Sequence, residues 1–191
     1  MVVGASIKSW AHYFLDMTDL KPYEQYLWSP KREDYENSGM PEDIDCVFCA
    51  QVEGDERVTK AAIFEDDFLM VELNVFPYNT GHLMVVPKRH VNDLTELEDD
   101  ERNRLFAMVQ KVEKLQKEVV EPAGIDIGMN IGKAAGESIP HLHVQLVPIY
   151  EKDRGFMETS LDTKVMKKSI EDMKEEYEEK TEILEDYWEE A

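Results

Sequence analysis

The stretch 141–148, HLHVQLVP, is the part of the chain best suited to chemistry on a phosphate. Its residues alternate between polar and apolar, which is the period of a β-strand with one buried face. We therefore expect His141, His143 and Gln145 to share one face, with about 7 Å between neighbours. One imidazole in such a row can attack a phosphorus atom, while a neutral carboxamide holds a phosphoryl oxygen. This pattern favours a functional interpretation over ordinary core or surface side chains.

The segment directly before this strand, residues 130–138, is rich in glycine and other small residues. Such a loop lets backbone N–H groups approach an anion closely. The formal net charge of the chain is −21, so a phosphate must be held locally, by backbone amides, neutral donors and a few cations such as Lys133. The same charge disfavours binding to nucleic acids, which needs a basic surface.

Length and composition predict one ordinary domain with appendages. The chain has 191 residues and two cysteines. No apolar run approaches the ~20 residues that span a bilayer. The N-terminal stretch lacks the continuous apolar core of a secretory signal. We expect a cytoplasmic protein in a reducing compartment, without a membrane or nucleic-acid partner.

The order of predicted elements is that of an α+β protein with a mainly antiparallel sheet. The candidate strands are residues 61–64, 68–73, 82–86, about 125–131 and 141–148. A long helix follows the third strand, starting at a capping-box pattern of Thr95 with Glu98 and ending before Pro122. His82, at the start of an apolar strand, is interpreted as structural.

Both ends of the chain differ from this central part. We predict an N-terminal extension at 1–40, a catalytic domain at 41–160 and an acidic C-terminal helix at 161–191. Apolar residues in the last segment recur mostly at three- and four-residue steps from about Thr163. Packing of this helix on its own core is the favoured interpretation, and a dimer contact is the main alternative.

A C-x-x-C pair, Cys46 and Cys49, is ambiguous by itself. It can be a redox pair, half of a metal site or two buried thiols. The parallel strand–helix–strand context of a thioredoxin-like redox pair is not visible in the sequence. Tetrahedral zinc needs two further ligands, for which His90 and His141 are candidates. The residues alone leave zinc and its absence equally open.

Together these segments resemble the histidine triad superfamily of nucleotide hydrolases and nucleotidyltransferases. Residues 141–147 fit the family pattern H-φ-H-φ-H/Q-φ-φ, where φ is apolar, and the likeness extends through 74–90 and 128–136. The cysteine pair, with the segments 27–30 and 155–157, looks like the branch related to diadenosine tetraphosphate phosphorylases. The resemblance implies an antiparallel sheet with a helix, usually as a homodimer.

The resemblance also implies roles for individual residues. His143 corresponds to the nucleophile that forms a nucleotidyl-histidine intermediate, and Gln145 replaces the third histidine of the pattern. The remaining implied roles are a ribose contact by Asn74, phosphate contacts by Asn130 and Ser138, and a structural zinc held by Cys46, Cys49, His90 and His141.

The function implied is nucleotidyl transfer from a dinucleoside polyphosphate, such as diadenosine tetraphosphate. Gln145 is always neutral and cannot supply a proton, so the site suits leaving groups that depart as stable anions. This favours phosphate as the acceptor. One alternative is a hydrolase that uses water on a dinucleoside polyphosphate or a nucleotide phosphoramidate. The other is an inactive nucleotide-binding scaffold, which the acidic C-terminus favours.

Overall fold

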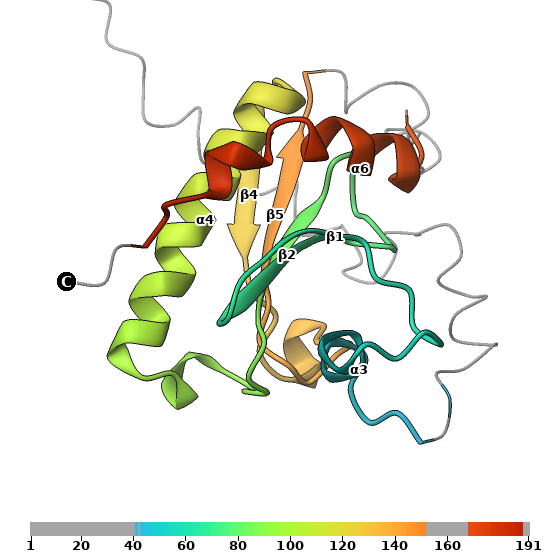
Figure 1. The fold of residues 1–191 in the computed structure, drawn as a ribbon, viewed down its shortest axis with the longest axis vertical. Coiled ribbons are helices and arrows are strands. Elements are labelled where there is room, and N and C mark those ends of the chain that lie inside the picture. The colour runs from blue at the N-terminus through green and yellow to red at the C-terminus, as the bar shows by residue number, and fades with distance from the viewer. Residues whose placement is uncertain (1–40, 42, 152–167, 189–191) are drawn as a thin grey trace, which may run out of the picture.

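A five-stranded antiparallel sheet forms the centre of the protein, with the strand order β1-β2-β3-β5-β4 (Figure 1). The computed structural model describes residues 41, 43–151 and 168–188, so the predicted extension at 1–40 and the segment 155–157 lie outside the described residues. The strands are β1 (Ala62–Glu65), β2 (Leu69–Leu73), β3 (Leu83–Pro87), β4 (Gly124–Gly128) and β5 (Val144–Ile149). The predicted α+β class with an antiparallel sheet is confirmed.

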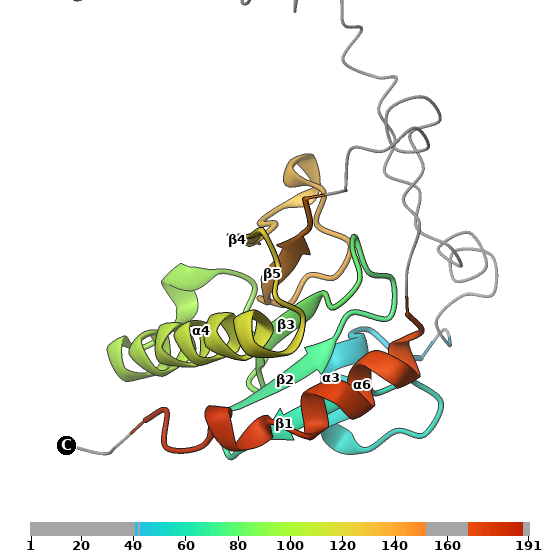
Figure 2. The same cartoon turned by 90° about the horizontal axis from the view of Figure 1, so that it is seen from above.

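The two faces of the sheet carry two different cores. Figure 2 shows helix α4 (Asp99–Val119) on one side of the sheet and helix α3 (Val47–Glu53) on the other. Leu69 and Val71 of β2 both belong to the larger core, under α4, whereas Met70 lies in the smaller core with Phe48 of α3. Because β2 and β3 are covered on both faces, all ten of their residues are buried.

Helix α4 begins three residues later than the sequence predicted, with Glu98 rather than Thr95 as its N-cap. The observed capping box joins Glu98 to Glu101, and the predicted pairing of Thr95 with Glu98 is wrong. Thr95 instead lies in a separate 3₁₀ turn, η1 (Leu94–Glu96), where its N–H donates to the Asp93 carboxylate. Asp93 therefore caps the short turn, and the acidic residues that follow suit the first turn of α4.

The C-terminal segment forms helix α6 (Ile170–Glu178) and a 3₁₀ turn, η3 (Thr181–Leu184), rather than one continuous helix. The Thr181 hydroxyl donates to the Glu178 carbonyl where α6 ends. Met173, Tyr177 and Leu184 are fully buried in the larger core. This segment packs on its own domain, beside β1 and α4 (Figures 1 and 2), as the favoured interpretation predicted.

Strand β5 is shorter than the predicted strand at 141–148. Its ladder to β3 begins at Val144, which pairs with Val85. Residues 141–143 of the predicted strand, His143 included, precede this ladder, and the Leu142 N–H donates to the Val91 carbonyl instead. Among the described residues, no helix is both long and apolar enough to span a membrane.

His82 has the structural role that its position predicted. Its ring is fully buried and stacks on Tyr78, with the ring centroids 5.3 Å apart. The Tyr78 N–H donates to Nδ1 of His82, which places the ring proton on Nε2. Burial lowers the pKa of His82 to about 3, with a smaller effect from His143.

We predict that His82 remains neutral in the folded protein at pH 5. Its folded pKa lies below the unfolded value, so the unfolded state binds the proton first. Its contribution to the free energy of unfolding is therefore complete above pH 6.5 and falls by about 1.4 kcal/mol per pH unit below it. NMR of the histidine side-chain nitrogens at pH 7 and pH 5 measures the protonation state of His82 in the folded protein. Titration of His82 near pH 6.5 would contradict the prediction.

Candidate functional site

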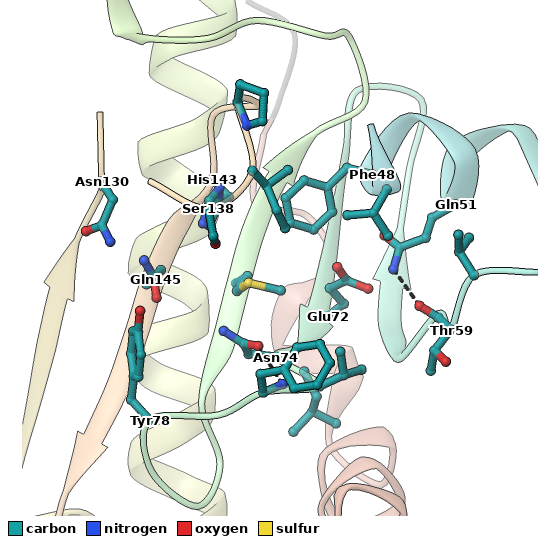
Figure 3. Close-up of a pocket in the computed structure, with 18 of the residues that line it drawn as sticks. Phe48, Gln51, Thr59, Glu72, Asn74, Tyr78, Asn130, Ser138, His143 and Gln145 are labelled. Carbon is teal, nitrogen blue, oxygen red and sulfur yellow. Dashed lines mark hydrogen bonds between the residues drawn. The ribbon is translucent and has the colours of Figure 1, made fainter. Parts of the chain in front are cut away.

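A cavity of about 580 Å³ lies on the α3 face of the sheet and collects the predicted site residues. His143, directly before β5, and Gln145, near the start of β5, both line it. Asn74 lines it from the position directly after β2. Asn130 and Ser138 line the same cavity from the small-residue loop (Figure 3). The structure thus brings together all five residues that the sequence predicted to touch substrate.

His143 is oriented by one backbone hydrogen bond. Its Nδ1 lies 2.8 Å from the His141 carbonyl oxygen, which can only accept, so Nδ1 carries the proton. The other ring nitrogen, Nε2, therefore holds a lone pair. The side chain is 7% exposed, and burial lowers the pKa of His143 below its ordinary value. An unprotonated imidazole nitrogen on the wall of a cavity is a competent nucleophile.

The loop before His143 is shaped by glycine. Gly132 and Gly136 have φ angles of 82° and 83°, values that L side chains rarely adopt, and they flank the short turn η2 (Lys133–Ala135). The Asn130 side chain donates to the Gly136 carbonyl at 3.2 Å and closes the loop. Lys133, expected to be a local cation for a phosphate, is exposed and does not line the cavity.

Asn74 serves the turn after β2 and also faces the cavity. Its Oδ1 accepts the Phe76 N–H at 2.8 Å, which is the turn role that any asparagine here can have. Figure 3 shows its carboxamide at the lower wall of the cavity, between Gln145 and Glu72. Since Oδ1 is used by the backbone, the amide N–H groups are the donors that it can offer a ligand.

The four predicted metal ligands form a second cluster, next to the cavity. Nδ1 of His141 lies 3.3 Å from Sγ of Cys46 and 3.7 Å from Sγ of Cys49. Nδ1 of His90 lies 3.2 Å from Sγ of Cys49. All four ligand atoms lie within 4.8 Å of one another, and both thiols are free.

The three distances between sulfur and nitrogen are close to those of a tetrahedral zinc site. Zinc bonds of about 2.3 Å to sulfur and about 2.0 Å to nitrogen give S···N edges of about 3.6 Å. Nε2–H of His141 donates to the Pro87 carbonyl at 2.8 Å, so Nδ1 is left free as the ligand atom. Burial lowers the pKa of His141 to about 4, which keeps the ring neutral for ligation. Two thiols and two imidazoles can hold zinc with no position left for a catalytic water.

Helix α3 connects the cluster to the cavity. Cys46 is its N-cap and Cys49 lies in its first turn. Between them, the ring of Phe48 lies 5.4 Å from the His141 ring and 5.3 Å from the His143 ring. An ion held by the cluster would therefore fix the cavity wall that α3 provides.

Phe48, Gln51 and Glu72 are among the cavity-lining residues that sequence reasoning missed. Glu72 left a signal in the sequence, because it is the one charged residue in the apolar run 68–73. Phe48 and Gln51 left none, since their placement depends on how α3 packs against the sheet.

Comparison with known proteins supports the resemblance. The family model "HIT domain" matches residues 56–152. An AP-4-A phosphorylase from Mycobacterium tuberculosis is 34% identical over 158 residues, which cover 78% of this chain and 80% of the relative.

Solved structures agree with this match. A zinc-bound histidine triad family protein from Mycobacterium smegmatis superposes with a TM-score of 0.60 at 28% identity, over 73% of this chain and 92% of the other. A hypothetical histidine triad nucleotide-binding protein from Sulfolobus tokodaii gives a TM-score of 0.61 at 27% identity, over 75% of this chain and 100% of the other. The chain therefore belongs to the HIT family and is an enzyme of the nucleotidyltransferase or hydrolase type that its sequence resemblance implies.

Proposed function

We propose that the protein transfers a nucleotidyl group from a dinucleoside polyphosphate to inorganic phosphate through a covalent intermediate on His143. The observation that carries this proposal is the hydrogen bond from Nδ1 of His143 to the His141 carbonyl, which leaves Nε2 as a lone-pair donor on the cavity wall. The similarity to an AP-4-A phosphorylase supports the same substrate class.

The reaction consists of two in-line displacements at one phosphorus atom. Nε2 of His143 attacks the α-phosphorus, a P–N bond forms, and the bridging P–O bond breaks. The nucleoside polyphosphate departs with the electron pair of that bond. An oxygen of inorganic phosphate then attacks the same phosphorus, the P–N bond breaks, and a nucleoside diphosphate leaves with Nε2 again unprotonated.

The neighbouring side chains are neutral donors, which suits a polyphosphate on a strongly acidic protein. Gln145, 8% exposed, can donate an N–H to a phosphoryl oxygen but cannot protonate a leaving group. Ser138 and Asn130 stand at the same end of the cavity (Figure 3) and are proposed phosphate contacts. The proposed role of Asn74 is a hydrogen bond from its amide to a ribose hydroxyl.

We predict that products depend on phosphate. Incubation with diadenosine or diguanosine tetraphosphate should give a nucleoside diphosphate plus a triphosphate only when phosphate is present. His143→Ala should lower turnover by at least about a thousandfold, since the covalent route is lost. Separation of the nucleotides by chromatography measures the products and the turnover rate. A thermal unfolding curve checks that the variant folds. A monophosphate plus a triphosphate with or without phosphate would identify water as the acceptor.

The scaffold alternative loses the feature that favoured it. The acidic C-terminal segment buries Met173, Tyr177 and Leu184 in the core of its own domain, so its apolar positions are used within the fold. Saturable nucleotide binding with no turnover of either dinucleotide would restore this alternative.

We also propose that Cys46, Cys49, His90 and His141 hold a structural zinc ion. The support is the clustering of the four ligand atoms within 4.8 Å of one another and the similarity to the zinc-bound protein from M. smegmatis. Cys46 and Cys49 form no disulfide, which is the state that a reducing cytoplasm maintains. We propose the cytoplasm as the compartment of the protein.

We predict near one zinc ion per chain in purified protein. Cys46→Ser should reduce the zinc content severalfold and lower the melting temperature, because the binding energy of a structural metal is folding energy. Elemental analysis and thermal unfolding measure the two effects. A chelator should destabilise the wild type and leave the variant almost unchanged. Fully stable, metal-free wild-type protein would contradict the zinc assignment.

A homodimer is proposed from the exposed edge of the sheet. β4 is an edge strand, and Ile127 and Ile131 on or beside it are 46% and 45% exposed. Such an edge is a template for pairing with a second copy. Ile127→Lys should shift the mass in solution, measured by light scattering, from dimer to monomer. Val52→Lys, at an exposed apolar position on α3, is the matched control, and a monomeric wild type would overturn the proposal.

A further inference from the structure

Glu72 is a carboxylic acid buried inside the cavity, and the proposed chemistry does not use it. It belongs to the interior strand β2, is 1% exposed, and pairs across the sheet with Met84 of β3. Burying a carboxyl group among apolar side chains is costly unless its oxygens find donors. Its Oε2 has no hydrogen-bond partner within the described part of the chain.

Gln51 presents a second buried acceptor at the same place. Its side chain comes from α3, is 4% exposed, and donates from Nε2 to the Thr59 carbonyl at 2.7 Å. This bond fixes the orientation of the carboxamide, because the flipped form would set two oxygens against each other. Its Oε1 then has no donor among the residues that the structure describes. Figure 3 shows Gln51 and Glu72 together, away from His143 and Gln145.

Apolar side chains make up much of the lining beside these two residues, namely Val47, Phe48, Val58 and Met84. Asp45, Arg57 and Thr59 also contribute to the lining. Apolar walls with two fixed polar atoms suit a flat aromatic ligand that has a hydrogen-bonding edge. A nucleobase has this shape, and the proposed phosphate contacts at the other end of the cavity place the base here.

We propose that Glu72 and Gln51 recognise guanine, with N1–H donating to Oε2 of Glu72 and the N2 amino group donating to Oε1 of Gln51. This inference rests on the proposed function and specifies its substrate: a dinucleoside polyphosphate whose transferred nucleotide is guanosine. Guanine presents two adjacent donors on its Watson–Crick edge. Adenine presents one donor beside an acceptor, and uracil presents one donor between two acceptors.

The charge state of Glu72 makes adenine the competing ligand. Burial raises the pKa of Glu72 to about 8, and Glu65 adds to this, whereas the Ala61 backbone, Lys60 and Gln51 act in the opposite direction. A protonated Glu72 can donate to N1 of adenine while Gln51 accepts from the N6 amino group. Guanine instead pairs with the carboxylate, through hydrogen bonds that a charged acceptor strengthens.

Equilibrium binding of mononucleotides to the full chain tests the inference without requiring turnover. Calorimetry at pH 8.5 compares GMP, AMP and IMP, which lacks the N2 amino group. We expect GMP to bind about tenfold more tightly than AMP, and more tightly than IMP. In Glu72→Gln, a carboxamide that can pair with N6 and N1 of adenine replaces the carboxylate. The ratio of GMP to AMP affinity should therefore fall at least about tenfold.

Two further variants separate base recognition from a structural role. Glu113→Gln removes a carboxylate of α4, on the other side of the sheet from the cavity, and it should leave the GMP to AMP ratio unchanged. Gln51→Leu should abolish the difference between GMP and IMP while Glu72 stays in place. A thermal unfolding curve shows whether Glu72→Gln folds. If it does not, the comparison of GMP with IMP binding by Gln51→Leu tests the inference.

A wild type that binds AMP as tightly as GMP overturns the inference, as does a GMP to AMP ratio that folded Glu72→Gln leaves unchanged. The proposed function survives both results if the dinucleotides are still turned over with phosphate. Absence of binding by every mononucleotide, together with absence of turnover, would overturn the inference and the proposed function at once.

Discussion

The hydrogen bond from Nδ1–H of His143 to the His141 carbonyl is the interaction on which the candidate site depends. It selects the ring tautomer that places a lone pair on Nε2, and it holds the ring in one orientation. The residue that supplies the carbonyl also places its own imidazole among the thiols of Cys46 and Cys49. Three consecutive residues thus join the candidate metal cluster to the candidate nucleophile, and their relative placement is set by a short piece of backbone.

Helix α3 connects the candidate metal cluster to the end of the cavity that holds Gln51 and Glu72. Two of the cluster's ligands lie at its N-terminus, Phe48 packs against both histidine rings, and Gln51 stands one turn further beside Glu72. A metal ion in the cluster would therefore fix a helix that lines the cavity as well as the short segment before β5 that carries the nucleophile. Seven residues of helix are too short to be stable by themselves, so external anchors are needed here.

Much of the fold and of the site could be predicted because the signals are local. Alternation in 141–148 and the apolar stripe of α4 predicted the faces that the structure buries, and the His141–Gln145 spacing placed the reactive side chains together. The predicted start of α4 was wrong because two separate caps lie close together here: Asp93 caps the η1 turn that holds Thr95, and Glu98 caps α4. Gln51 was missed because it meets Glu72 through the packing of α3 against β2, which no local pattern encodes, whereas Glu72 stands out as the one charged residue in the apolar run 68–73.

The central claim is that the nucleotidyl group passes through His143 in two displacements. The most direct test is the stereochemistry at the transferred phosphorus, measured with a substrate whose α-phosphorus carries one sulfur in a known configuration. Each in-line displacement inverts the configuration. Two displacements through a histidine intermediate predict net retention in the nucleoside diphosphate product, and net inversion would show direct transfer to phosphate and contradict the account.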